Sequence, residues 1–410
     1  MTWQSERIEV TTAGGDGDEY RQWVAETSRA FLQGRPSDGW FDVWCRVARH
    51  DGQRPFGVME DGRIVGTFCE FPWALDLGRG SVPFWAITDV TVRPTHRRRG
   101  MLRGMMTDSL ERAVLEGMPL AGLTVSEGGI YRRFGFGMAG DRWKVDIAAR
   151  DFQLVNPCGG TFELVEPVAV GEWFDDVARR TRAAWPGVHP MGAQREIASA
   201  SYDFDGDKVP TDRYAVVHRA TDGDVDGVAV WRHDRSADRG TLVVESLWGE
   251  PGAVFGLLEF CCRIDLIEVV RLGFAPPPQQ LRASLIDPRA VTVTHQSDAV
   301  WLRPLDVPAC VAARPWGADG VVMLRVDDPL GHAAGTWRIT VVDGCGRAER
   351  AAADEPALGL GVDALGSLLG EGRLADLIMS GRVEADAGVD RALASRVFGS
   401  VPSTWHNVFF

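Results

Sequence analysis

The spacing of apolar positions over the first 150 residues predicts a series of alternating elements. Helical spacing over Asp18–Gln33 predicts an amphipathic helix. Alternation over Phe56–Glu60 and Arg63–Phe71, on either side of Glu60-Asp61-Gly62, predicts a β-hairpin. The pattern then predicts a strand over Phe84–Val92, a helix from Met101 to about Glu116, a strand over Gly122–Val125 and a final strand near Trp143–Ala148. Such an order predicts a mixed α/β domain.

Two further blocks follow. The second predicts a helix, three strands and another helix, over Glu172–Trp185, Tyr214–His218, Val228–Arg232, Thr241–Leu247 and Val254–Ile264. It loosely repeats the first block, and Pro276-Pro277-Pro278 breaks the chain near its end. The third predicts strands at Val321–Val326 and Thr336–Val342 around the turn at 328–331, and helices at Val362–Leu369 and Asp390–Phe398.

A basic turn lies between the third strand and the helix of the first block. The chain reads V-T-V-R-P-T-H-R-R-R-G-M-L from Val90 to Leu102, and the helix should bury Met101, Met105, Leu110 and Val114 on one face. Free N–H groups and the helix dipole at such a start favour a pyrophosphate, and three consecutive arginines add countercharge. The turn lacks the spacing of a P-loop or of a dinucleotide-binding turn.

A second motif follows the next strand. It reads S-E-G-G-I-Y-R-R-F-G-F-G from Ser126 to Gly137 and puts Tyr131 just beyond that strand. The first motif resembles the acyl-CoA pyrophosphate loop R-x-x-G-x-[GA] of GNAT N-acetyltransferases, with Leu102 in place of the small last residue. Together the two motifs resemble the Eis (enhanced intracellular survival) family, which acetylates amines on polycationic molecules.

The resemblance extends over the whole chain. It implies an α/β protein with two tandem GNAT-like domains, the second without a cofactor site, and a C-terminal sterol-carrier-like α+β domain. We expect these domains at residues 1–150, 151–290 and 291–410. In the second domain the turn Gly249-Glu250-Pro251-Gly252 has no arginine, and Glu250 would repel a pyrophosphate. The resemblance also implies a homo-oligomer, a hexamer in the family.

The composition indicates which partners, compartment and metal sites to expect. The 410 residues have a formal net charge of -13, which argues against binding nucleic acid and suits a cationic substrate. No apolar run approaches the roughly 20 residues of a membrane span. Residues 1–7 do not read as a secretory signal, and the seven scattered cysteines fit a reducing compartment, so we expect a cytoplasmic protein. Cys261 and Cys262 should be core residues, and no spacing predicts a metal site.

The resemblance implies which residues bind acetyl-CoA as co-substrate. The strand before the basic turn should splay from its neighbour at a bulge, so that its backbone meets the pantetheine arm and an N–H near Val90 faces the thioester oxygen. The expected cofactor residues are Val90, Thr91, Val92, Arg98, Arg99, Gly100, Met101, Leu102, Arg103, Ser126 and Glu127.

Two residues are candidates for catalysis. Tyr131 is the expected general acid, because a phenol stays protonated at neutral pH and can protonate a leaving thiolate. The Eis family uses the carboxylate of its own C-terminal residue as the base, and this chain ends in two phenylalanines, Phe409 and Phe410. That carboxylate has an ordinary pKa of about 3.5, so it acts through a water or as an electrostatic anchor. Alternatively, Tyr131 is a packing residue, and the two phenylalanines close the third domain's core.

Acids and a flat aromatic face suit an amine-rich ligand, so Trp40, Glu26 and Asp38 are candidate acceptor-binding residues. The sequence therefore predicts an acetyl-CoA-dependent N-acetyltransferase acting through a ternary complex on primary amines, of aminoglycosides or lysine-bearing peptides as the resemblance implies. A longer acyl-CoA as donor remains open. So does a non-catalytic lipid- or protein-binding module with a vestigial CoA loop.

Overall fold

The computed structural model describes residues 6–9, 18–204, 207–399 and 403–410, so the first five residues lie outside it. The chain forms two compact units. Unit 1 comprises residues 1–140, 298–402 and 409–410, and unit 2 comprises residues 141–297 and 403–408. Among the described residues, no helix is both long and apolar enough to cross a membrane.

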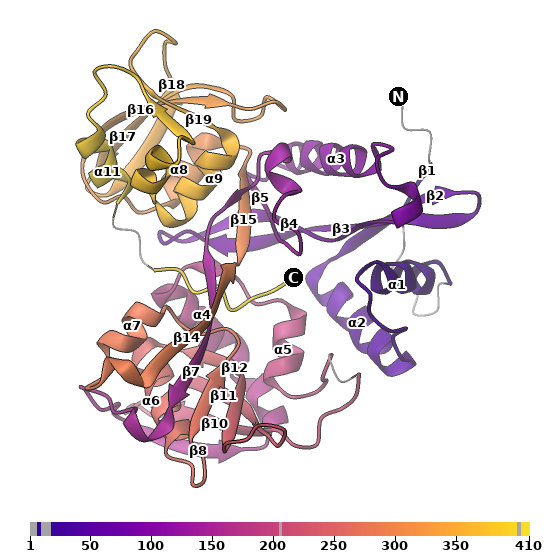
Figure 1. The fold of residues 1–410 in the computed structure, drawn as a ribbon, viewed down its shortest axis with the longest axis vertical. Helices are drawn as coiled ribbons and strands as arrows, with labels where there is room; N and C mark the ends of the chain where they lie inside the picture. Colours follow the sequence, from indigo (N-terminus) through magenta and orange to yellow (C-terminus); the bar gives the residue numbers. More distant parts are fainter. Residues whose placement is uncertain (1–5, 10–17, 205–206, 400–402) are drawn as a thin grey trace. The chain divides into compact units, whose positions relative to one another are not determined.

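Unit 1 begins with a mixed sheet in the order β1-β2-β3-β4-β5-β15-β6. Its strands are β1 Glu6–Glu9, β2 Arg54–Glu60, β3 Arg63–Asp76, β4 Ser81–Val92, β5 Leu120–Thr124, β6 Gly137–Met138 and β15 Val300–Pro304. Its helices are α1 Asp18–Ala30, α2 Asp38–Asp51 and α3 Met101–Leu115, with 3₁₀ turns η1 Pro94–His96 and η2 Tyr131–Phe134. Helix α3 covers one face of the sheet, and α1 and α2 cover the other (Figure 1).

The local sequence explains how these elements begin and end. Asp61 and Gly62 both have positive φ, as the tight turn between β2 and β3 requires, which confirms the predicted hairpin. The Ser37 hydroxyl caps the start of α2, and Gly52 ends that helix in the left-handed conformation. On α3, Met101, Met105 and Leu110 are buried as predicted, but Val114 is 42% exposed. The predicted apolar stripe was therefore wrong at its last position.

Two strands lie in sheets that the sequence pattern did not predict. Strand β7, Asp141–Ala148, contains the predicted final strand of the first domain, but it pairs with β13, Val269–Leu272, in the sheet of unit 2. Strand β15 instead pairs with β5 and β6 in the first sheet, although it lies far along the chain. The sequence pattern assigned Trp143–Ala148 to the first domain, whereas this strand belongs to the sheet of unit 2. Alternation identifies a strand, but it does not identify the strand's partner.

The C-terminal part of unit 1 is an α+β layer structure with the sheet order β18-β17-β16-β19-β20. Its elements are α8 Val307–Ala313, β16 Gly320–Asp327, β17 Gly335–Val342, β18 Cys345–Arg350, β19 Leu358–Gly361, α9 Val362–Glu371, α10 Leu374–Met379, β20 Val383–Ala385 and α11 Arg391–Phe398. The predicted elements of this block are all present. Helix α9 packs on β15 and β6.

Unit 2 has a sheet in the order β14-β7-β13-β12-β11-β10-β8. Its further elements are η3 Ala149–Asp151, β8 Thr161–Val165, η4 Pro167–Glu172, α4 Phe174–Ala184, β9 Gly187–Val188, α5 Gly192–Ala198, β10 Tyr214–Arg219, β11 Val225–Asp234, β12 Thr241–Gly249, α6 Pro251–Cys262, α7 Pro278–Ala283, η5 Pro288–Ala290 and β14 Val291–Asp298. Glu250 stands at the start of α6 and pairs with Arg180 at 3.1 Å. The start of α6 therefore carries an acid, whereas three arginines precede the start of α3. Cys261 and Cys262 are buried core residues, as predicted.

A buried ion pair supports the turn that carries Tyr131. Arg303 on β15 donates to Asp328 at 2.7 Å and to the carbonyl oxygen of Phe134, the last residue of η2, at 2.9 Å. Both charged side chains are almost completely buried. Burial by itself raises the pKa of Asp328, but the charge of Arg303 and backbone N–H donors outweigh it and lower that pKa. The pair is therefore ionised, and it fixes η2 to the sheet.

We expect Asp328→Asn to lower the free energy of unfolding by about 3 kcal/mol or more, because it leaves the buried Arg303 charge without a counterion. Urea unfolding measures this loss. Asp386→Asn is the matched control, since it makes the same change in the exposed Arg325–Asp386 pair. We expect a much smaller effect there. Equal losses in the two variants would contradict a special role for the buried pair.

Candidate active site

Strand β4 contains a bulge where it leaves its parallel neighbour. The register with β5 ends at Ile87 opposite Leu123. The register with β3 shifts at the same place, because Thr88 lies opposite Cys69 and Thr91 opposite Thr67, which leaves two residues of β4 opposite one of β3. The bulge and the opening between β4 and β5 are those that the sequence analysis expected. The end of β4 therefore has one edge that β5 does not cover.

No side chain of the protein caps the start of α3, where the basic turn ends. Gly100 is the N-cap residue at φ 88°, and no side chain caps the helix. The first N–H groups of α3, those of Met101, Leu102 and Arg103, therefore have no carbonyl partner within the helix. At Gly100 a residue with a side chain would be strained by the positive φ, although a Cβ atom there would meet no neighbouring atom within 4 Å.

The three consecutive arginines differ in their contacts. Arg99 donates to both carboxylate oxygens of Glu60, at 3.1 and 3.2 Å, and Arg97 lies 3.5 Å from the Val92 carbonyl oxygen. Arg98 is exposed at φ 66°, and within the described part of the chain its side chain has no hydrogen bond or ion pair. The Arg98 guanidinium is therefore available to an anion, whereas Arg99 mainly fixes the turn to the β2–β3 hairpin.

His96 also contacts the hairpin. Its Nε2 lies 2.8 Å from Glu60, and its Nδ1 lies 2.7 Å from the Thr95 hydroxyl. Glu60 thus binds two side chains of the basic turn, and it holds the turn in place. The sequence analysis missed this role, because a hairpin glutamate is ordinarily only a solvent-exposed charge.

Tyr131 begins the η2 turn that follows β5. Its ring is buried and meets Phe136 edge-on at 6.3 Å, and Phe134 and Phe136 are core residues. Among the described residues its hydroxyl has no hydrogen-bond partner. Burial, and then the negative charge of Glu127, raise the pKa of Tyr131 to about 12. The phenol therefore keeps its proton throughout the neutral range. Ser126 and Glu127 are exposed on the turn that joins β5 to η2.

The C-terminal residue contacts the first sheet. The Thr124 hydroxyl, at the end of β5, donates to the terminal oxygen of Phe410. The Phe410 ring meets Phe84 of β4 edge-on at 6.0 Å, whereas Phe409 is 51% exposed. Phe410 thus packs on the first sheet of unit 1 rather than in the core of the C-terminal part of that unit. Its carboxylate lies where β4 and β5 separate.

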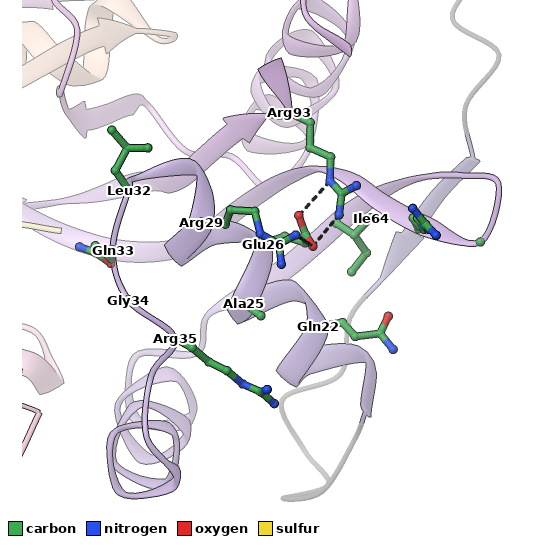
Figure 2. Close-up of a pocket in the computed structure, with 12 residues that line it drawn as sticks. Gln22, Ala25, Glu26, Arg29, Leu32, Gln33, Gly34, Arg35, Ile64 and Arg93 are labelled. Carbon is green, nitrogen blue, oxygen red and sulfur yellow. Dashed lines mark hydrogen bonds and ion pairs between the residues drawn. The ribbon is translucent and has the colours of Figure 1, made fainter. Parts of the chain in front are cut away.

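The three candidate acceptor-binding residues lie on α1 and α2. Glu26 is bound by Arg93 at 2.5 Å and by Arg29 at 2.6 Å, and Figure 2 shows the Glu26–Arg93 pair with dashed lines. A cavity of about 770 Å³ beside it is also lined by Arg35 and Arg63. Because arginines outnumber acids there, we expect Glu26 to fix β4 to α1 rather than to bind an amine.

On α2, Asp38 is exposed and pairs with Arg21 at 2.8 Å. Trp40 stacks on Trp44 with ring centroids 5.1 Å apart, and it is partly exposed. Of the three candidates, Trp40 thus offers a flat aromatic face, and both acids already have cationic partners. Among the described residues there is no group of three or more His, Cys, Asp or Glu side chains that could hold a metal.

Comparison with known families matches three parts of the chain. Two models described as acetyltransferase (GNAT) domains match residues 15–139 and 178–304. A sterol carrier protein domain model matches residues 307–407. These matches agree with the predicted fold class of two tandem GNAT-like domains followed by a sterol-carrier-like domain.

Relatives that match over most of their length identify the family within the GNAT N-acetyltransferases. N-acetyltransferase Eis of Mycobacterium tuberculosis is 30% identical over 92% of this chain and 91% of its own length. The chain belongs to the Eis family of N-acetyltransferases. An uncharacterized N-acetyltransferase of Streptomyces griseus is 33% identical over 94% of this chain and 96% of its own. The crystal structure of Eis1 from Mycobacterium abscessus superposes with a TM-score of 0.81 at 26% identity, covering 99% of this chain and 100% of that one.

Membership of the Eis family confirms the predicted enzyme class. The chain is an N-acetyltransferase, so its acceptor is an amine, and its GNAT fold implies an acyl-CoA donor. The alternative of a non-catalytic binding module with a vestigial CoA loop is therefore set aside.

Proposed function

We propose that this Eis-family enzyme transfers the acetyl group of acetyl-CoA directly to a primary amine of a polycationic acceptor, such as an aminoglycoside or a lysine side chain. The observation that carries the proposal is the combination, in one sheet, of an uncapped arginine-bearing helix start, a splayed strand and a buried phenol. The net charge of -13 favours cationic acceptors over anionic ones.

In this proposal the donor is held mainly by backbone groups. The N–H groups of Met101, Leu102 and Arg103 bind the pyrophosphate, with Arg98 supplying charge and Gly100 the turn. The pantetheine arm lies along the open edge of β4 at 90–92, with the turn at 126–127 beside it. An N–H at the bulge then faces the thioester oxygen, and one such donor lowers a barrier by roughly 3–4 kcal/mol.

The transfer itself needs a proton donor and an anchor for the amine. Tyr131 gives its proton to the sulfur as the C–S bond breaks, which suits a phenol that is fully protonated at neutral pH. The Phe410 carboxylate, held by Thr124, attracts the acceptor's ammonium to the opening between β4 and β5. No covalent acetyl-enzyme forms, because donor and acceptor are bound together.

The proposal also covers the domain boundaries, the cellular compartment, the oligomeric state and the acyl donor. We place domain boundaries near residues 150 and 290, apart from the exchanged strands β7 and β15. The free cysteines, mostly buried, suit a reducing cytoplasm. The family resemblance favours a homo-oligomer, namely a hexamer. Both acetyl-CoA and a longer acyl-CoA should be tested as donors.

Two measurements test this function. Thiol release from acetyl-CoA, followed across aminoglycosides and lysine-containing peptides, should rise with at least one of these amines. Calorimetric titration should show acetyl-CoA binding that weakens about 10-fold in Arg98→Ala, because one charge-assisted contact is lost. Arg235→Ala removes a similarly exposed arginine from unit 2 and should bind like the wild type. Absence of thiol release with every amine would refute the acceptor assignment.

A further inference from the structure

The cavity beside Glu26 takes no part in the proposed acetyl transfer. Its volume of about 770 Å³ falls within the roughly 300–1,000 Å³ of small-molecule sites. Its walls come from α1, from the loop between α1 and α2 and from the β2–β3 turn, and the residue after β4, Arg93, completes them (Figure 2). None of the described residues that line it is among those expected to bind the acyl donor. The cavity is therefore a second place where unit 1 can hold a ligand.

This cavity is basic, although the protein is acidic. The described residues that line it include one acid, Glu26, and four arginines, Arg29, Arg35, Arg63 and Arg93. Their formal net charge is +3, whereas the whole chain carries -13. Arg29 lies in the last turn of α1, and the C-terminal end of a helix carries only about half a negative charge. The helix end therefore does not balance the arginines.

The single acid is already engaged through both of its oxygens. Arg93 donates to the Oε2 atom of Glu26 at 2.8 Å and pairs with its Oε1 atom at 2.5 Å. Arg29 pairs with the same Oε1 atom at 2.6 Å. One carboxylate thus holds two guanidinium groups, and it has no oxygen left for the other arginines of the cavity.

Arg35 and Arg63 have no counterion. Both side chains are exposed, and within the part of the chain that the structure describes neither makes a hydrogen bond or an ion pair. The acids nearest to them along the chain bind elsewhere, since Glu60 is held by the basic turn and Asp38 by α1. Asp61 is not among the residues that line the cavity. These two arginines are therefore available to an anion.

The charge of the lining fits an anion with two phosphate groups. A guanidinium presents paired N–H donors that match the oxygens of a phosphate or a carboxylate. A phosphate ester carries roughly -1.5 to -2 at neutral pH, so two of them carry about -3 to -4. That charge balances the +3 of the lining, whereas a single carboxylate balances only one of its arginines.

Apolar groups in the lining can contact a carbon skeleton. Leu32 follows α1 at φ 58°, in the left-handed position that glycine usually takes, and it is 95% exposed. The Gln33 N–H donates to the Ser28 carbonyl oxygen at 2.8 Å and fixes this turn. Ile64 of β3 adds a second apolar side chain, and Gly34 leaves open space where a Cβ atom would lie. An organic phosphate uses these groups, whereas inorganic phosphate does not.

We infer that this cavity binds a small organic molecule with two phosphate groups, at a site separate from that of the acyl donor. Arg35 and Arg63 supply the unpaired positive charge. Glu26, with the two arginines that it holds, fixes the wall formed by α1 and the end of β4. Leu32 packs on the carbon skeleton. The same positive charge repels an ammonium, so the cavity does not serve a cationic acceptor.

Calorimetric titration tests this site with fructose 1,6-bisphosphate as the probe. The protein is first saturated with coenzyme A, which fills the donor site. We expect the bisphosphate to bind, fructose 6-phosphate to bind roughly 10-fold more weakly because it lacks one phosphate, and fructose to give no heat. Arg35→Ala and Arg63→Ala should each weaken bisphosphate binding about 10-fold, and the double variant should abolish it. Arg235→Ala, an exposed arginine of unit 2, is the matched control and should bind like the wild type.

Two results of this titration would overturn the inference. One is the absence of heat with the bisphosphate up to roughly 10 mM. The other is binding that survives in the double variant. If that surviving signal disappeared in Arg98→Ala, the probe would lie at the start of α3 and not in the cavity.

Thermal unfolding separates binding from a structural role of the arginines. Without ligand, Arg63→Ala should have the same Tm as the wild type or a higher one, because it breaks no contact and removes a like charge. The bisphosphate should raise the Tm of the wild type and leave that of the double variant unchanged. A lower Tm of ligand-free Arg63→Ala would show that this arginine stabilises the fold, and it would contradict a role reserved for a ligand.

Discussion

Replacing Tyr131 with phenylalanine should lower kcat about 10²-fold while the dissociation constant of acetyl-CoA stays the same. The ring packs edge-on against Phe136, and phenylalanine preserves that contact, so the change removes only the hydroxyl. That hydroxyl has no hydrogen bond among the described residues, so its loss breaks no internal contact. What disappears is the proton for the departing thiolate, and general acids of this kind contribute roughly 10²–10⁴ to the rate.

The pH dependence gives an independent check. Because burial and the charge of Glu127 raise the pKa of Tyr131 to about 12, ionisation of the phenol should not limit the wild-type rate below roughly pH 11. Tyr214→Phe, an exposed tyrosine of unit 2, serves as the matched control. Unchanged turnover in Tyr131→Phe would remove the phenol from the mechanism and leave it a packing residue.

Short-range patterns predicted the local architecture well. The β2–β3 hairpin, the basic turn and helix α3 all depend on neighbouring residues, whose conformational preferences the sequence displays directly. The bulge of β4 was expected only because the family resemblance implied it. Which sheet strands β7 and β15 join depends on partner strands more than a hundred residues away along the chain. The spacing of apolar residues does not indicate those partners. The fold class was therefore predictable, whereas the exchange of strands between the sheets was not.

Charged residues were harder to interpret than apolar ones. Glu26 and Asp38 were predicted to bind an amine. In the structure Glu26 pairs with Arg93 and Asp38 pairs with Arg21, and no sequence pattern displays these two pairings.

Extending the chain beyond Phe410 should lower kcat/KM for the amine about 10- to 100-fold. A peptide tag converts the terminal carboxylate into a neutral amide, so the acceptor's ammonium loses one charge-assisted contact, and such contacts contribute roughly 1.5–3 kcal/mol. Acetyl-CoA binding should persist, because the pyrophosphate site at the start of α3 does not include the C-terminus.

Two variants show whether the charge or the ring matters. Phe410→Leu keeps the carboxylate but loses the contact with Phe84, so it should cost less than the tag. Deleting Phe410 leaves a carboxylate one residue short, beyond the reach of the Thr124 hydroxyl, and it should resemble the tag. The same tag at the N-terminus controls for its bulk. A C-terminally tagged enzyme working at the full rate would show that the terminal carboxylate does not anchor the amine.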